Sequence, residues 1–183
     1  MDPNHFYTLL NLGKFYLSKQ QIKQAVPYLD HAIQIDGSNA RAHHLRGLAY
    51  QASGENLMAA VEYRKALPDA AYTKTIKTYY LNFGTALIAA GYYEEAAQML
   101  EQYTRLSPRD HEGHYQLGVA YEIMSERSLD DVTTRRAVEV LKHSIELEPR
   151  HAMAHYYLSK AYRRLEMFDE ADNQFELYER LSP

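Results

Sequence analysis

Residues 9–32 read LLNLGKFYLSKQQIKQAVPYLDHA, and this stretch decides the fold. Apolar residues recur in it at helical spacing, first at Leu9, Leu12 and Tyr16 and then at Ala25, Leu29 and Ala32. Such stripes predict two helices, each with one apolar face. Gly13 stands in the first stripe, where the missing side chain lets the partner helix approach closely. The stretch therefore predicts a pair of antiparallel helices packed face to face.

The same pattern returns along the chain. Small residues mark the corresponding place in five units, at Gly13, Gly47, Gly84, Gly118 and Ser159. The first and third intervals between them are equal, at about 34 residues, which is a known repeat length. The second and fourth intervals are longer by three and by seven, as insertions into the same unit would make them. In the stretch 80–103, YLNFGTALIAAGYYEEAAQMLEQY, the glycine, the alanine and the aromatic residues fall at the same offsets.

The repeated pattern of a bulky residue, Leu-Gly, Tyr, Ala, an aromatic residue and Pro resembles the tetratricopeptide repeat (TPR) family. The resemblance covers nearly the whole chain and implies an all-α fold, an α-solenoid in which antiparallel helix pairs form a right-handed superhelix. One hairpin cannot bury its apolar face alone, so neighbouring repeats stack on it. We expect a single array over residues 1–183, with repeats at about 6–39, 40–76, 77–110, 111–151 and 152–183.

Two insertions interrupt the repeat, near residues 68–76 and 125–134. Pro68 and Asp69 predict that a helix ends early and that a turn is added before the next helix. In the second insertion, Ser128 and Asp131 have the spacing of a helix-capping pair. The seven extra residues predict either a longer loop or a longer pair of helices. The insertion is either functional or a loop that the fold tolerates without a function, and both interpretations remain open.

Both ends of the chain coincide with repeat boundaries. Residues 2–5, Asp-Pro-Asn-His, resemble the end of a preceding repeat, and the chain stops at Pro183, where a repeat's proline falls. No further helix follows to cover the apolar face that carries Phe175 and Tyr178. We therefore expect a segment of a longer TPR protein, or self-association through uncapped repeat ends.

Composition and charge exclude several classes of function. The chain has 46% hydrophobic and 24% charged residues, as globular proteins do, and a net charge of −4, which does not favour nucleic-acid binding. We find no apolar run long enough to cross a bilayer and no signal peptide, so membrane insertion is not expected. The compartment stays undetermined: cytoplasmic or, in a longer parent, periplasmic.

Catalytic and cofactor motifs are missing as well. The chain has no cysteine, which removes disulfides and thiolate metal sites. None of its eight glycines forms a nucleotide-binding loop or a hydrolase motif. Because no nucleophile, base and orienting group stand out together, we predict that the protein is not an enzyme and needs no cofactor.

Two histidine pairs raise the question of a metal site. His111 and His114, and likewise His151 and His155, lie three and four residues apart and would share a helix face. No carboxylate completes either pair at a clear ligand spacing, and His43, His114 and His155 share one bulky place of the repeat. We therefore interpret them as packing residues and predict no metal site.

The resemblance implies a ligand surface on the concave face, formed by first-helix residues that lie off the packing positions. Carried over to this sequence, the candidate groove residues are Leu10, Lys14, Arg41, His44, Leu48, Leu81, Thr85, Ile88, Tyr115, Val119, Tyr156, Lys160 and Arg163. This lining is largely apolar and aromatic, with a basic end at Lys160, Arg163 and Arg164. It suits an amphipathic helix or an extended peptide with apolar anchors and an acidic part. The alternative is that these residues pack against neighbouring helices.

The family's chaperone-binding clamp is not predicted here. That clamp grips a C-terminal EEVD with Lys, Asn and Arg side chains, whereas this chain has Leu10, Leu45 and Thr78 at three of the places. The leading hypothesis is a non-enzymatic scaffold that binds a protein or peptide partner. The alternative is a structural or self-assembling segment of a larger protein, such as a bacterial secretion, pilus or envelope-assembly component, that acts through its repeat ends.

Overall fold

The structure is a computed structural model that describes residues 3–70, 76–128 and 130–182, and each of its elements is an α-helix. The helices are α1 (Pro3–Ser18), α2 (Ile22–Ile35), α3 (Ala40–Ala52), α4 (Asn56–Ala70), α5 (Ile76–Ala90), α6 (Tyr93–Leu106), α7 (His111–Ser128), α8 (Asp131–Leu147), α9 (Ala152–Arg164) and α10 (Phe168–Leu181). The predicted all-α fold is confirmed. Within the described ranges, no helix combines the length and the apolar character that crossing a membrane requires.

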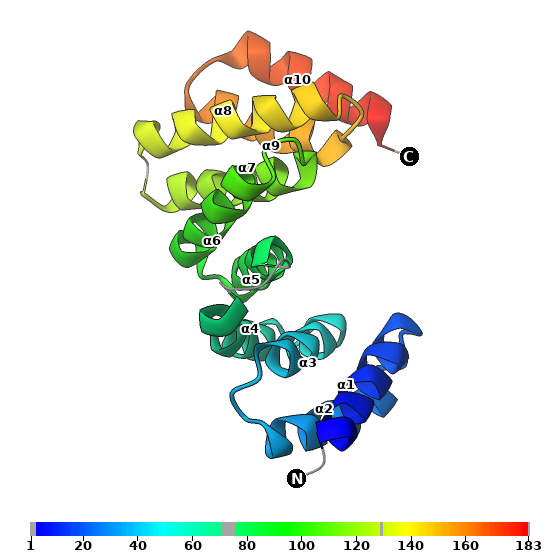
Figure 1. The fold of residues 1–183 in the computed structure, drawn as a ribbon. Helices are drawn as coiled ribbons and strands as arrows, with labels where there is room; N and C mark the ends of the chain where they lie inside the picture. The colour runs from blue at the N-terminus through cyan, green and yellow to red at the C-terminus, as the bar shows by residue number, and fades with distance from the viewer. Residues whose placement is uncertain (1–2, 71–75, 129, 183) are drawn as a thin grey trace. The chain divides into compact units, whose positions relative to one another are not determined.

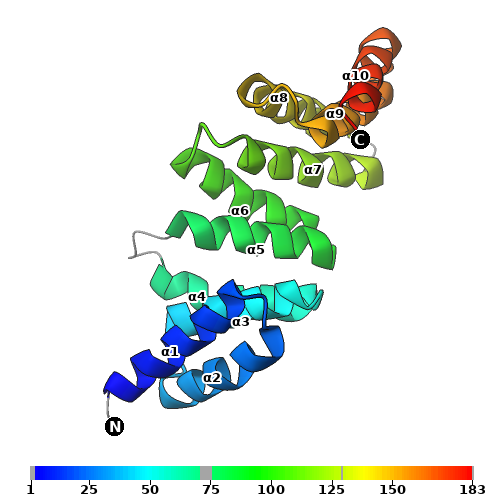
Figure 2. The same ribbon diagram turned by 90° about the vertical axis from the view of Figure 1, so that its right-hand side faces the viewer.

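The chain divides into two compact units, Met1–Gly91 and Tyr92–Pro183. In the first unit each of the helices α1 to α5 packs on the next, and α6 to α10 do the same in the second (Figure 1, Figure 2). First helices of neighbouring pairs also touch, α1 with α3, α3 with α5, and α7 with α9. This is the packing expected of an α-solenoid, in which helix pairs stack along the chain.

Glycines at the centre of the hairpins allow the two helices to approach. A Cβ atom on Gly13 would lie 2.4 Å from Leu29 Cδ2, and one on Gly118 would lie 2.4 Å from Leu141 Cγ. Leu29 and Leu141 are fully buried. The facing apolar stripes predicted for residues 9–32 therefore pack as expected, with a large side chain seated on each glycine.

Four of the turns inside the hairpins use a left-handed residue. Gln20, Gly54, Gly91 and Glu166 have φ values of 57°, 78°, 87° and 59°. Gly54 and Gly91 adopt this backbone conformation at little cost, but a side chain makes it unfavourable at Gln20 and Glu166.

The first insertion differs from the prediction, whereas the second takes one of its two predicted forms, a longer pair of helices. Helix α4 continues to Ala70, so Pro68 does not end it, and residues 71–75 lie outside the described residues. In the second insertion α7 and α8 have 18 and 17 residues, against 13 and 14 in α9 and α10, so the extra residues lengthen the helices. The cap is Asp130, whose side chain accepts bonds from the N–H groups of Val132 and Thr133. The predicted Ser128 cap is wrong, because the Ser128 hydroxyl donates to the Met124 carbonyl in the last turn of α7.

A histidine near the start of a first helix ties that helix to the loop before it. His43 Nε2 lies 2.9 Å from the Gly37 carbonyl oxygen, and His155 Nε2 lies 3.0 Å from that of Pro149. Both rings are buried. His114 makes the equivalent contact, 3.0 Å from the Pro108 carbonyl oxygen. Each acceptor precedes its histidine by six residues, so the shared repeat place has a shared structural role.

The turn residues lead to a test of stability. We expect Glu166→Gly to raise the free energy of unfolding by about 0.5–1 kcal/mol, because glycine relieves the left-handed strain. Gly91→Ala is the reverse change and should lower the free energy of unfolding by a similar amount. The added Cβ would have no atom within 4 Å, so the effect comes from the backbone alone. Urea unfolding of both variants and the wild type measures the effect. Equal stabilities in all three would contradict this account of the turns.

Candidate functional site

The predicted groove residues lie on α1, α3 and α5 in the first unit and on α7 and α9 in the second. In the first unit Lys14 and Arg41 are exposed, Leu48, Leu81, Thr85 and Ile88 are half-buried, and Leu10 and His44 are buried. Leu10 is 1% exposed and belongs to the core cluster, so it offers no surface to a ligand.

A hollow of about 600 Å³ opens between α1, the start of α2 and α3. Its lining is mainly apolar and consists of Lys14, Leu17, Ser18, Gln20, Ile22, Leu45, Leu48 and Ala52. The structure thus brings Lys14 and Leu48 of the predicted groove together. Arg41, Leu81, Thr85 and Ile88 do not line this hollow.

Thr85 and His44 bond across to the neighbouring helix. Gln51 Nε2 on α3 donates to Thr85 Oγ1 on α5 at 3.1 Å. Asn82 Nδ2, also on α5, lies 2.9 Å from His44 Nε2 on α3. For these two residues the packing alternative describes the structure better than an open groove.

Burial also decides the charge of His44. Its ring stacks on Tyr79, with 4.0 Å between the ring centroids. Desolvation lowers the pKa of His44 to about 4, so the ring is neutral near pH 7. His44 therefore cannot supply a positive charge for an acidic ligand at that pH.

In the second unit the predicted residues differ widely in exposure. Tyr115, Tyr156 and Lys160 are half-buried, Arg163 is exposed, and Val119 is only 5% exposed. The Tyr156 ring lies 5.1 Å from the Tyr178 ring, which ties α9 to α10. Tyr115 and Tyr156 thus combine packing with a partly accessible aromatic surface.

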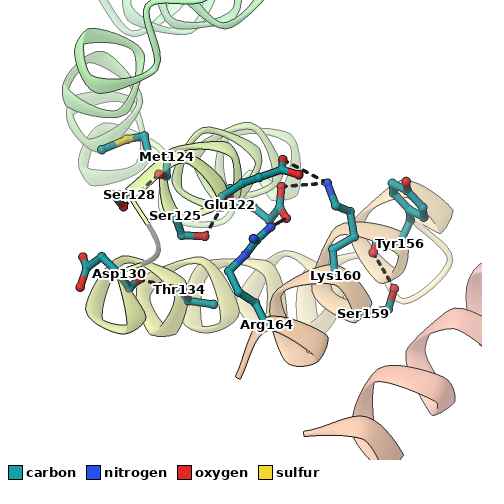
Figure 3. Close-up of polar contacts among 11 residues, drawn as sticks. Glu122, Met124, Ser125, Ser128, Asp130, Thr134, Tyr156, Ser159, Lys160 and Arg164 are labelled. Atoms are coloured by element: carbon teal, nitrogen blue, oxygen red, sulfur yellow. Dashed lines mark hydrogen bonds and ion pairs between the residues drawn. The ribbon is translucent and has the colours of Figure 1, made fainter. Parts of the chain in front are cut away.

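The predicted basic end is neutralised by carboxylates within the chain. Figure 3 shows Lys160 and Arg164 on α9 reaching the Glu122 carboxylate on α7, which has no exposed surface. Their nitrogens lie 3.3 and 2.8 Å from its oxygens. Arg163 pairs with Asp172 at 2.9 Å. Carboxylates of the same chain therefore balance the positive charge of this basic end.

Electrostatics strengthen this cluster of ion pairs. Burial alone would lower the pKa of the Lys160 ammonium, but the Glu122 and Glu126 carboxylates outweigh burial and raise it. The basic end was predicted from the sequence without Glu122 as its partner. The sequence does contain a signal for this pairing: Glu122 precedes Lys160 by 38 residues and Arg164 by 42 residues. These spacings bracket the interval between the equivalent repeat positions Gly118 and Ser159.

The histidines meet in combinations that the sequence pairs did not predict. His114 lies against His143, with 4.4 Å between the ring centroids, and not against His111. His111 instead approaches His151, and Glu112 lies beside them. One potential ligand atom from each of these three residues lies within 4.8 Å of the other two.

Comparison with family models gives two matches. Residues 6–39 and residues 81–124 each match a model described as Tetratricopeptide repeat.

Curated proteins and solved structures add further similarities. A stretch of 91 residues is 35% identical to the type IV pilus assembly protein PilF of Pseudomonas aeruginosa PAO1, covering 50% of this chain and 35% of that relative. The matched stretch thus spans about a third of PilF. A MamA crystal structure superposes with a TM-score of 0.83 at 18% identity, covering 98% of this chain and 93% of the other.

A second structural neighbour is YrrB, described as a TPR protein with an unusual peptide-binding site. It gives a TM-score of 0.82 at 21% identity, covering 96% of this chain and 85% of YrrB. At this level of identity, the likeness to MamA and YrrB shows the fold.

The pKa of His44 predicts a loss of stability in acid. The pKa of His44 is about 6.5 in the unfolded chain and about 4 in the folded chain. Between these values only the unfolded chain binds the proton, so the free energy of unfolding falls as the pH drops from 6.5 to 4. We expect His44→Gln to reduce the loss between pH 7 and pH 5 by about 1–2 kcal/mol. Urea unfolding at both pH values measures it, with the exposed His31→Gln as the control. An unchanged pH dependence in His44→Gln would disprove the assignment.

The Glu122 cluster predicts an asymmetric response to neutralisation. Glu122→Gln leaves Lys160 and Arg164 without their buried partner and should destabilise the chain by about 1–3 kcal/mol, because both cations keep some access to water. Glu126→Gln removes a half-exposed partner of the same lysine and should cost less than about 0.5 kcal/mol. Thermal and urea unfolding compare the two. An equal loss of stability in the two variants would mean that the burial of Glu122 does not strengthen its ion pairs.

Proposed function

Because this chain is a tetratricopeptide repeat protein, we propose that it is a non-enzymatic scaffold that binds a peptide or helix of a partner protein. The proposed ligand surface in the first unit is centred on Lys14 and Leu48, with Arg41, Leu81 and Ile88 as further candidates. In the second unit Tyr115 and Tyr156 are the candidates. TPR arrays act in general as protein-interaction scaffolds, which supports this class of function.

The hollow between α1 and α3 is the observation on which the proposal rests. Apolar side chains of Leu17, Leu45 and Leu48 line it, and Lys14 is part of the same lining. A concave apolar surface with few polar groups is typical of ligand sites. It suits one apolar anchor of a peptide, with an acidic group next to that anchor to meet Lys14.

The similarity to YrrB favours a peptide as the ligand. YrrB is described as having a peptide-binding site, and its fold covers 96% of this chain. The closed ion pairs of Lys160, Arg163 and Arg164 make the second unit less suited to an acidic ligand than its sequence indicates. We therefore assign the main contact to the hollow in the first unit.

A second candidate function is a part in assembling a bacterial type IV pilus. The 35% identity to PilF over 91 residues favours it, and it is compatible with scaffold activity. If the repeat ends carry out this function, self-association should depend on the half-buried Phe175 of α10. Light scattering of Phe175→Glu beside the wild type would separate this route from peptide binding.

Peptide selection tests the groove directly. We expect a phage-displayed random peptide library panned on the whole chain to enrich sequences with an apolar anchor beside an acidic residue. Leu48→Glu should weaken the affinity of a selected peptide by at least about tenfold, because a carboxylate would occupy the apolar hollow and repel the acidic residue. Lys14→Glu tests the same hollow at an exposed position, where folding is least affected. Fluorescence polarisation measures both affinities.

The matched control is Leu57→Glu, since Leu57 on α4 is 54% exposed and lies outside the hollow. Melting temperatures of all variants show whether each is folded. Selected peptides that bind Leu48→Glu and Lys14→Glu as tightly as the wild type would refute the hollow as the ligand site.

A further inference from the structure

We propose that His111, Glu112 and His151 form a binding site for a divalent transition-metal ion of the zinc class. His111 and Glu112 open α7, and His151 immediately precedes α9. The site thus joins the starts of two adjacent first helices in the second unit. This proposal revises our expectation from the sequence that the chain has no metal site.

The three side chains already lie close to a coordinating arrangement. One ligand atom of each lies within 4.8 Å of the others, and His151 Nε2 is 3.6 Å from Glu112 Oε2. Ligand atoms about 2.0–2.2 Å from a tetrahedral zinc ion are separated by about 3.3 Å. Side-chain rotations at two helix starts can close the remaining gap of up to about 1.5 Å.

Surrounding groups hold the ligands in place. Gln116 Nε2 donates to Glu112 Oε1 at 2.7 Å, which engages that oxygen and leaves Oε2 on the side of His151. The Tyr115 ring lies against His151, with 4.4 Å between the ring centroids. Outer contacts of this kind orient metal ligands and raise the affinity of a site.

A second, independent observation comes from His111. Its Nδ1 atom is buried and has no hydrogen-bond partner among the described residues. Buried polar atoms normally have a partner, so an unsatisfied nitrogen in a group of potential ligands points to a missing partner. A metal ion bound at His111 Nδ1 would supply this partner.

His151 also caps helix α9, and metal binding at this residue would end that contact. Its Nδ1 accepts a hydrogen bond from the Ala154 N–H at 3.1 Å and so caps α9. In the neutral ring the proton is therefore on Nε2, which faces Glu112. Coordination through Nε2 moves this proton to Nδ1 and breaks the cap, so metal binding at this histidine exchanges one stabilising contact for another.

The donor set selects the class of metal. Two imidazoles and one carboxylate suit zinc and its first-row neighbours, whereas magnesium and calcium prefer oxygen ligands alone. Three protein ligands leave a coordination position open for water or for a group of a partner protein. Zinc ions are therefore the appropriate probe, with magnesium as the comparison.

Isothermal titration of the whole chain with zinc chloride near pH 7.5 tests the site. We expect one site per chain that magnesium does not fill. His151→Asn is the central variant, because asparagine keeps the helix cap but removes the imidazole. It should lower the zinc affinity at least about tenfold, with a metal-free melting temperature close to that of the wild type. Glu112→Gln should weaken binding in the same direction.

His143→Asn is the matched control, since the His114–His143 pair is the other close histidine contact of this unit among the described residues. It should leave the zinc affinity unchanged. The proposal is overturned if zinc does not bind, if His151→Asn and Glu112→Gln bind zinc like the wild type, or if only His143→Asn loses it. Cobalt absorption gives a separate readout: its visible bands should be lost in His151→Asn and kept in His143→Asn, and bands that persist in His151→Asn would exclude coordination by His151.

Discussion

Close approach of two helices at a glycine is the contact on which the hairpins α1–α2, α3–α4 and α7–α8 depend. Gly13 and Leu29 are sixteen residues apart, as are Gly47 and Tyr63, and in both pairs a large side chain occupies the place of the missing Cβ. Gly118 and Leu141 make the same contact at a spacing longer by seven. The seven extra residues correspond to about two helical turns, one on each helix of the pair. A lengthened helix pair keeps the contact in register.

The sequence was sufficient to predict the helix pairs, because apolar spacing and small residues act locally within each repeat. It left the insertion after Tyr121 open between a loop and longer helices, and the register of the glycine contact shows why the helices lengthened. It failed where the outcome depends on the angle between neighbouring repeats. Glu122 meets Lys160 and Arg164 across that boundary. The repeat interval brings these positions near one another, but periodicity alone does not specify which of the side chains there form ion pairs.

The candidate site follows the same division. Lys14 and Leu48 were predicted from their repeat positions and do meet in one hollow, because stacking of α1 on α3 is a general property of the repeat. Leu10 and His44 were predicted by the same rule but lie in the core. Side chains at these two repeat positions reach the surface only where neighbouring first helices are far enough apart. Around His44 the rings of Tyr63 and Tyr79 fill the space between the helices.

The longer α7–α8 pair also has a consequence for the order of folding. Repeat proteins fold from whichever neighbouring elements gain most from local contacts, and structure then spreads to adjacent repeats. An added turn on each helix gives this pair more mutual contact, while Asp130 fixes the start of α8. We therefore expect the second unit to nucleate at this hairpin, with α9 and α10 added afterwards on its surface.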